Sequence, residues 1–180
     1  MAGVWTNNWR AFRNIMLMGS HYNGFSTITT TSGTSLSNRF SDTLTATSPM
    51  GKYTTDYIGS NATCTLRLGT GTAAPTATDY FLTSEANISI LSIVAADPTF
   101  DTTTGTMTRV ISLSVQNQTA DSITIQEWGI FGTVHTVANN SSNLASCLLY
   151  HEVLDSGVTL APLQAATLTL TMTLTLTDIL

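Results

Sequence analysis

The sequence predicts an all-β protein, and three features of its composition and pattern support that prediction. Threonine is β-branched and favours strands, and the 180 residues include 35 Thr and 18 Ser. Lys and Glu, which favour helices, are scarce because charged residues make up only 9% of the chain. Residues 167–177 alternate Thr with Leu or Met, which is the period of a strand with one buried face. We therefore expect a β-sandwich of the immunoglobulin-like or jelly-roll type, with a short N-terminal α-helix or arm.

The N-terminal residues 1–20 are predicted to form this amphipathic helix or arm. Apolar residues recur every three or four positions, which places them on one helical face: Trp5, Trp9, Phe12 and Met16. Thr6 precedes the run as a candidate N-cap, and Gly19 follows it as a natural stop. A helix this short is marginal alone, so its aromatic face packs either on the parent domain or on a neighbouring subunit. On the second alternative these four residues are interface residues.

Residues 21–180 are predicted to form a single β-sandwich domain that includes an extended loop around 35–52. Phe25–Thr31 has the composition of a strand, and Thr31–Thr34 contains the glycine of a closing turn. The stretch Ser35–Lys52 has no clear periodicity. Because long irregular loops are usually functional or disordered, we expect this stretch to be ordered by contact with a partner.

The strand signal strengthens after residue 62, where short apolar or alternating runs are separated by polar turns. Strands are predicted at 63–68, 87–95, 107–115, 123–134, 144–154, 158–160 and 167–177. The inward residues of 107–115 are predicted to be Ile111, Leu113 and Val115. The connections are predicted at 69–75, 97–105, 117–121, 138–143 and 156–162, with a short turn of helix at 79–82.

Charge and hydropathy exclude several functional classes. The net charge is −5, and six Lys and Arg cannot supply the basic stripe that nucleic-acid binding needs. No apolar run is long enough to span a membrane, and polar residues interrupt the N-terminal segment, so no signal peptide is predicted. Cys64 and Cys147 could form one disulfide, but two buried thiols are the expected arrangement.

Candidate catalytic and metal-binding residues are few. None of the histidines lies in a recognisable catalytic motif: His21, His135 and His151. Glu127 and Glu152 lie in apolar strands and could in principle form a carboxylate pair, although Glu127 beside Trp128 is more typical of a structural acid. Asp97 and Asp101 could bind Ca²⁺ weakly, but aspartates in turns more often cap local backbone N–H groups. We predict no cofactor, no metal site and no enzymatic activity.

Several short segments, in this order along the chain, resemble small all-β structural proteins of tailed bacteriophages. They are Thr6-Asn7-Asn8-Trp9, Thr31–Thr34, Leu68–Leu82, Ile123–Phe131, Leu148–Leu154, a Leu-Ala-Pro turn and the closing Thr/Leu strand. The resemblance implies a non-enzymatic virion component, assembled in the host cytoplasm as a symmetric oligomer. Its expected role is a capsid decoration or cement protein that contacts the major capsid protein through the N-terminal helix and loops.

Three alternatives stay open. A structural protein of the neck, tail or fibre base of the virion has the same sequence features. A carbohydrate-binding or adhesin β-sandwich is an alternative from another class, and it would need exposed aromatic side chains on a strand face or on loops. A hydrolase, supported only by Glu127 and Glu152, ranks third.

Overall fold

The computed structural model describes residues 3–11, 27–37, 64–138 and 141–175, and strands dominate these ranges. The all-β prediction is therefore confirmed. The strands are β1 (Val4–Trp5), β2 (Thr27–Thr29), β3 (Ser35–Ser37), β4 (Cys64–Gly69), β5 (Ile88–Ala95), β6 (Thr99–Asp101), β7 (Thr106–Asn117), β8 (Ile123–Ala138), β9 (Ser141–Leu160) and β10 (Ala165–Thr175). Residues 7–11 are helical.

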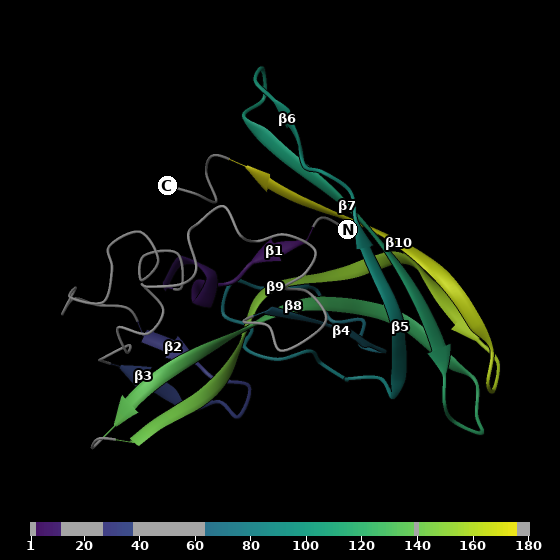
Figure 1. The fold of residues 1–180 in the computed structure, drawn as a ribbon, viewed down its shortest axis with the longest axis horizontal. Helices are drawn as coiled ribbons and strands as arrows, with labels where there is room; N and C mark the ends of the chain where they lie inside the picture. Colours follow the sequence, from purple (N-terminus) through teal and green to yellow (C-terminus); the bar gives the residue numbers. More distant parts are fainter. Residues whose placement is uncertain (1–2, 12–26, 38–63, 139–140, 176–180) are drawn as a thin grey trace.

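The first sheet has the strand order β1-β9-β8-β4, and every pairing in it is antiparallel. Its centre is the long β8–β9 hairpin, which crosses the molecule in Figure 1. Pairing runs from Ile123 opposite Leu160 to Ala138 opposite Ser141. The sequence predicted two strands at 144–154 and 158–160 with a turn between them, and this is wrong. The segment is one continuous strand because β8 supplies a pairing partner along most of its length.

The second sheet has the order β10-β7-β5, with β6 also paired to β7. β10 and β7 pair without irregularity from Ala165 opposite Gln116 to Thr175 opposite Thr106. The predicted alternation of β10 is confirmed, because Leu168, Leu170 and Leu174 are buried while the threonines at 167, 169, 171 and 173 are exposed. The predicted inward residues of β7 are also confirmed: Ile111, Leu113 and Val115 are fully buried.

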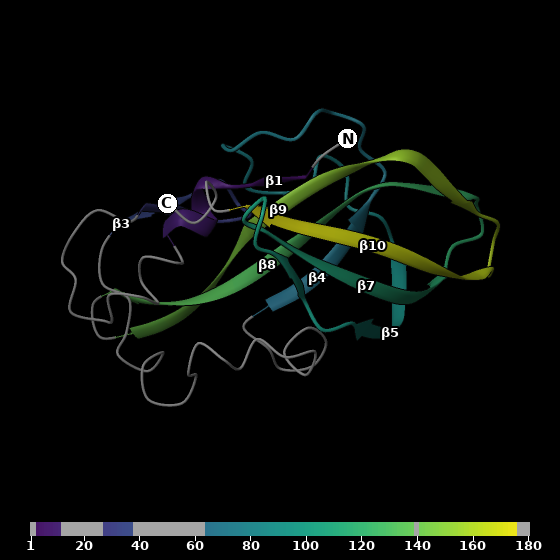
Figure 2. The same ribbon diagram turned by 90° about the horizontal axis from the view of Figure 1, so that it is seen from above.

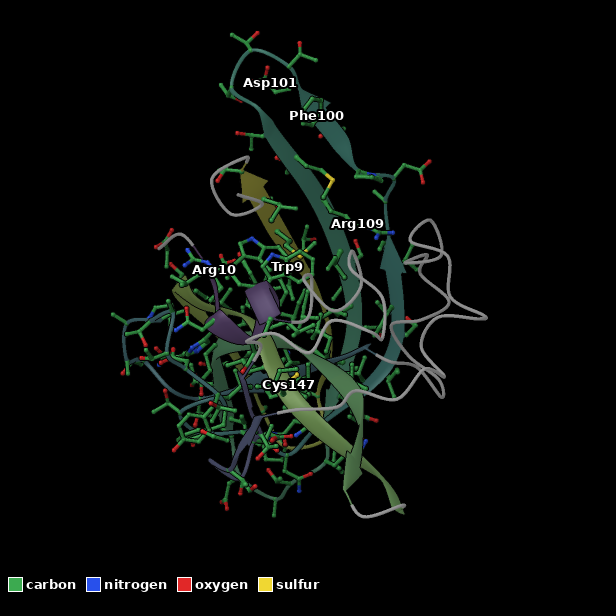
Figure 3. All side chains as sticks on the ribbon, turned by 90° about the vertical axis from the view of Figure 1, so that its left-hand side faces the viewer. Trp9, Arg10, Phe100, Asp101, Arg109 and Cys147 are labelled. Carbon is green, nitrogen blue, oxygen red and sulfur yellow. The ribbon has the colours of Figure 1, made fainter. Side chains whose placement is uncertain are left out.

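One hydrophobic core joins the two sheets. Residues of both sheets share it: Leu66, Leu68, Ile125, Trp128, Ile130 and Tyr150 from the first, and Ile111, Leu113, Val115, Leu168 and Leu170 from the second. Figure 2 shows β9 of the first sheet and β10 of the second running along the same side of the molecule. The β6–β7 hairpin instead projects away from the body, and it carries Phe100 and Asp101 near its tip (Figure 3).

Three local predictions are corrected. The predicted turn at 97–105 contains strand β6, because residues 99–101 pair back onto β7. The loop expected to begin at Ser35 begins with strand β3, which pairs with β2 across the predicted turn, where Gly33 has φ 78°; the rest of 38–52 lies outside the described residues. Residues 79–82 are not helical, and the chain turns at 76–79 instead.

Among the described residues, no helix has both the length and the apolar character needed to cross a lipid bilayer.

Candidate functional site

The N-terminal segment packs on the edge of the first sheet. The Trp5 ring contacts Trp9 at 4.7 Å and Tyr150 at 4.9 Å between centroids. Both tryptophans are half-buried against the shared core. The Trp5 indole Nε1–H also donates to the carbonyl oxygen of Thr173 in β10 at 2.9 Å. Of the predicted interface residues, Trp5 and Trp9 thus contact their own domain, whereas Phe12 and Met16 lie outside the described residues.

Two buried polar residues hold this segment in place. The sequence predicted Thr6 as the N-cap of the helix that follows, and this is wrong. The Thr6 hydroxyl instead donates to the carbonyl oxygen of Leu148 at 2.6 Å. The Asn8 side chain donates to the backbone oxygen of Thr29 at 2.9 Å and accepts from its N–H at 2.8 Å. This bidentate contact ties the helix at 7–11 to β2.

A cluster of three ionisable residues lies on the outer face of the first sheet, away from the shared core. We call Asp79, Glu127 and His151 the acid–histidine cluster. His151 Nε2 is 2.9 Å from Glu127 Oε2, and His151 Nδ1 is 2.7 Å from Asp79 Oδ2. Glu127 is 0% exposed and His151 only 1%, so solvent does not reach either side chain.

Glu127 also anchors residues 70–86, which we call the covering loop. Its carboxylate accepts backbone N–H groups from Gly71 at 3.0 Å, Thr83 at 3.1 Å and Ser84 at 2.7 Å. A Cβ at Gly71 would stand 2.5 Å from Glu127 Oε1, and one at Gly69 would meet the same oxygen at 2.5 Å. The glycines predicted to form a permissive turn are thus required here for close approach to the buried acid.

Hydrogen bonds surround the ionisable groups of the cluster. The Glu127 carboxylate accepts three backbone N–H groups, and each ring nitrogen of His151 faces a carboxylate oxygen. Partial burial of Asp79 acts to raise its pKa, but hydrogen bonds from Thr76 and His151 outweigh it and the pKa lies below its usual value. The imidazole ring of His151 therefore lies between two carboxyl groups.

The contacts of the cluster join the covering loop to the first sheet. Asp79 belongs to the loop, whereas Glu127 and His151 belong to β8 and β9. Both ring nitrogens of His151 lie against carboxyl oxygens at a place closed to solvent. Leu82 of the same loop packs against Phe131 and Leu148, which closes this face of the sheet with apolar contacts.

Glu127 and Glu152 do not form a carboxylate pair. Glu127 lies opposite Val153 and Trp128 lies opposite Glu152, so the two acidic side chains point to opposite faces of the sheet. Glu152 accepts a hydrogen bond from the Tyr150 hydroxyl at 2.5 Å. Burial raises the pKa of Glu152, against the lowering effect of this hydrogen bond. Glu127 is instead a buried acid whose hydrogen-bond partners belong to the covering loop and to His151.

The remaining candidates have local roles or lie elsewhere. Asp101 accepts bonds from Thr103 N–H at 2.8 Å and from the Thr104 hydroxyl at 2.8 Å, so it caps its own turn; these bonds lower the pKa of Asp101. His135 occupies β8 opposite Leu144, and His21 is outside the described residues. Within the described part of the chain, no three His, Cys, Asp or Glu side chains are placed to hold a metal ion.

The two cysteines flank β8. Cys64 in β4 and Cys147 in β9 both lie opposite Gly132. Two strands on either side of a third are about 9–10 Å apart, which exceeds the reach of a disulfide. Cys147 is buried, and its thiol donates to the carbonyl oxygen of Gly132 at 3.6 Å.

No sequence pattern predicts the acid–histidine cluster. Its members are 48 and 24 residues apart, since 127 − 79 = 48 and 151 − 127 = 24, and no motif links them. The available signal was the presence of ionisable residues inside apolar strands, Glu127 in one and His151 beside Glu152 in the other, since buried ionisable groups require partners. Comparison with protein families, with curated proteins and with solved structures finds no match to this chain.

Proposed function

We propose that this chain is a non-enzymatic structural protein of a tailed-phage virion, most simply a capsid decoration or cement protein. In this proposal the chain is a β-sandwich with an N-terminal helix, and it contacts the major capsid protein through that helix and its loops. The neck, tail or fibre base is the alternative location on the particle.

The observation that carries the proposal is the outer face of the second sheet. Successive rows across β5, β7 and β10 place Ser92 beside Ser114 and Thr167, and Val94 beside Ser112 and Thr169. The other outward positions of β7 and β10 are Thr106, Thr108, Val110, Gln116, Ala165, Thr171, Thr173 and Thr175. The surface of these three strands contains no charged side chain, and Asp101 in the short strand β6 lies at its end, opposite Thr106. Surfaces that remain in water normally intersperse charges, so a face of this kind suits a protein whose surface is covered by other subunits.

The contacts of the ionisable residues support the same class of function. The residues that sequence alone left as catalytic or metal-binding candidates fix a loop (Glu127 and His151), cap a turn (Asp101) or accept a bond from a neighbouring tyrosine (Glu152). A rigid scaffold with an anchored loop is what a structural subunit needs.

The carbohydrate-binding alternative needs exposed aromatic side chains on a strand face or on loops. Trp128 in β8 does not supply one, because it is fully buried. Among the described residues, the well-exposed aromatic rings are Phe81 on the covering loop and Phe100 on the projecting hairpin. They lie on separate elements and do not form a shared sugar-stacking platform.

Localisation on purified particles tests the role. Phages whose genome encodes the chain are fractionated into heads and tails, and the chain is quantified by mass spectrometry in each fraction. Stoichiometric recovery with heads supports decoration, and recovery with tails supports the alternative location. Absence from both fractions overturns the proposal.

A second experiment tests the N-terminal anchor. Deleting residues 1–20 would remove the buried Thr6 and Asn8 and so damage the domain itself. Arg10→Glu is better, because Arg10 is exposed on the helix at 7–11. We expect reduced occupancy on particles for Arg10→Glu and full occupancy for the matched charge reversal Asp97→Lys, which lies at an exposed position in the β5–β6 connection. Equal occupancy of both variants would show that the helix is not the anchor.

A further inference from the structure

The second sheet ends at β10, and this edge is the feature that carries a further inference. β10 is 11 residues long, and the described strands pair with it only on the β7 side. A free sheet edge presents a row of backbone N–H and C=O groups that can pair with another strand.

Two hydrogen bonds identify which residues present these groups. In an antiparallel pair, successive residues point their backbone groups alternately toward and away from the partner strand. Asn117 N–H donates to Gln164 O at 3.0 Å, so even-numbered positions face β7. Thr173 O accepts from Trp5 instead, so odd-numbered positions face the edge. Thr167, Thr169 and Thr171 therefore direct their N–H and C=O groups outward.

The β10 edge lacks the features that normally prevent strand pairing. Residues 165–175 contain no charged residue and no proline, and their register with β7 has no bulge. The opposite edge of the same sheet differs, because β5 has a register shift between Ile90 and Ser92. Bulges, charges and prolines are the usual protections of an edge, so β10 is the unprotected edge of this sheet.

The sequence of β10 is also complementary to itself. An antiparallel pairing of two β10 strands about a twofold axis at Thr169 places Thr167 opposite the second copy's Thr171. The same register places Leu168 opposite the second copy's Leu170, so the leucine faces of both copies become continuous. We propose that β10 pairs with β10 of a second copy of this chain, which joins the two second sheets into one sheet across an isologous dimer.

Trp5 limits the length of this pairing. Its indole N–H already donates to Thr173 O, so the second copy pairs with the edge from Thr167 to Thr171. Three residues with outward groups, each exchanging two bonds with its counterpart, give about six backbone hydrogen bonds. Threonines that face each other across the axis add side-chain pairs on the outer face.

The dimer is tested by measuring the mass of the full chain in solution, for the wild type and for a variant that carries a charge on the β10 edge. Sedimentation velocity over a concentration series should show a species of twice the 19.2 kDa chain mass. Thr169→Lys places two like charges opposite each other at the twofold axis, and we expect the dimer to weaken at least about tenfold. Ser112→Lys is the matched control, because Ser112 is the neighbour of Thr169 on the same face but lies on the central strand. We expect the control to dimerise like the wild type.

A cross-link tests the register. Residues opposite each other in a hydrogen-bonded antiparallel pair have Cα atoms about 5.5 Å apart, within disulfide range. Mild oxidation should therefore link Thr169→Cys into a dimer on a non-reducing gel, while Ser112→Cys and the wild type stay unlinked.

A chain that stays monomeric across the series overturns the proposal, and so does a dimer that Thr169→Lys leaves as tight as the wild type. The pairing does not depend on the virion role. If the chain is absent from particles but dimeric in solution, the virion role is wrong and the β10 pairing is supported. If the chain is bound to particles but monomeric, the β10 pairing is wrong and the virion role is supported.

Discussion

At the scale of single residues, the burial of the Glu127 side chain is the main feature of this chain with few acidic and basic residues. The carboxylate accepts three backbone N–H groups and lies 2.9 Å from His151 Nε2, all shielded from water. A buried polar group is tolerated when it is hydrogen-bonded. All three N–H groups belong to the covering loop, so removal of the Glu127 carboxylate should weaken the attachment of that loop to the sheet.

We expect Glu127→Gln to lower the free energy of unfolding by about 1–3 kcal/mol, because an amide NH2 group replaces one carboxylate oxygen and leaves buried N–H donors of the covering loop without an acceptor. Urea denaturation followed by circular dichroism measures this difference. Glu85→Gln is the control, because Glu85 forms an exposed ion pair with Arg67 at 3.2 Å and such pairs contribute at most about 1 kcal/mol. Equal losses in the two variants would contradict the structural role of the cluster.

Asp79 gives the cluster an acid-sensitive component. The folded-state pKa of Asp79 is below the ordinary value of 3.8. The stabilisation is therefore fully present above pH 3.8 and is lost as the pH falls through the folded-state pKa. We expect Asp79→Asn to be less stable than the wild type near neutral pH, with the difference shrinking below pH 3.8. A difference that does not change in acid would show that the ionised carboxylate is not what stabilises the fold.

Glu152 is predicted to behave in the opposite way. Burial raises its pKa above 4.5, so folding favours the protonated form. That contribution is present below pH 4.5 and is lost as the pH rises through the folded-state pKa. Glu152→Gln keeps the size of the side chain and an acceptor for the Tyr150 hydroxyl. Near neutral pH we expect this variant to be at least as stable as the wild type in thermal unfolding, with no advantage below pH 4.5.

At the scale of elements, β10 shows how an alternating pattern fixes a register. A slip of one residue would expose its leucines and bury its threonines, and the observed pairing with β7 keeps Leu168 and Leu170 in the core. The pattern alone was sufficient to predict this strand and its buried face.

We expect Leu170→Ala to destabilise the protein by about 2–5 kcal/mol, because Leu170 is 2% exposed and its truncation leaves a cavity. Thr171→Ala, one position away on the exposed face, should change stability by less than about 0.5 kcal/mol. Chemical denaturation of both variants at one protein concentration measures the contrast. Similar losses at the two positions would mean that β10 has no single buried face.

At the scale of the whole molecule, Cys64 and Cys147 lie on the two strands that pair with β8 on either side. This position predicts that the stability of the protein does not depend on redox conditions. Because Cys64 and Cys147 are too far apart to bond to each other, a reducing agent should leave the melting temperature of the protein unchanged. Calorimetry with and without dithiothreitol measures this. A lower melting temperature under reduction would contradict the strand register.

Local pattern accounts for the elements that the sequence predicted well. The all-β class follows from the threonine content, and the buried faces of β7 and β10 follow from alternation, which needs only neighbouring residues. The turn at Gly33 follows from the conformational freedom of glycine at positive φ. Each of these properties depends on residues close together in the chain, so each can be predicted from sequence.

The tertiary structure decided everything that depends on distant partners. β9 continues through a predicted turn because β8 pairs with it, and the segment 99–101 is a strand because β7 lies beside it. Asp79, Glu127 and His151 meet only when the covering loop folds onto the first sheet. Pairing across a sheet and the burial of a charge are long-range interactions, and single-sequence periodicity does not contain them. The sequence by itself therefore determined the strand class and the apolar faces, while the folded chain determined which strands pair and which charges are joined.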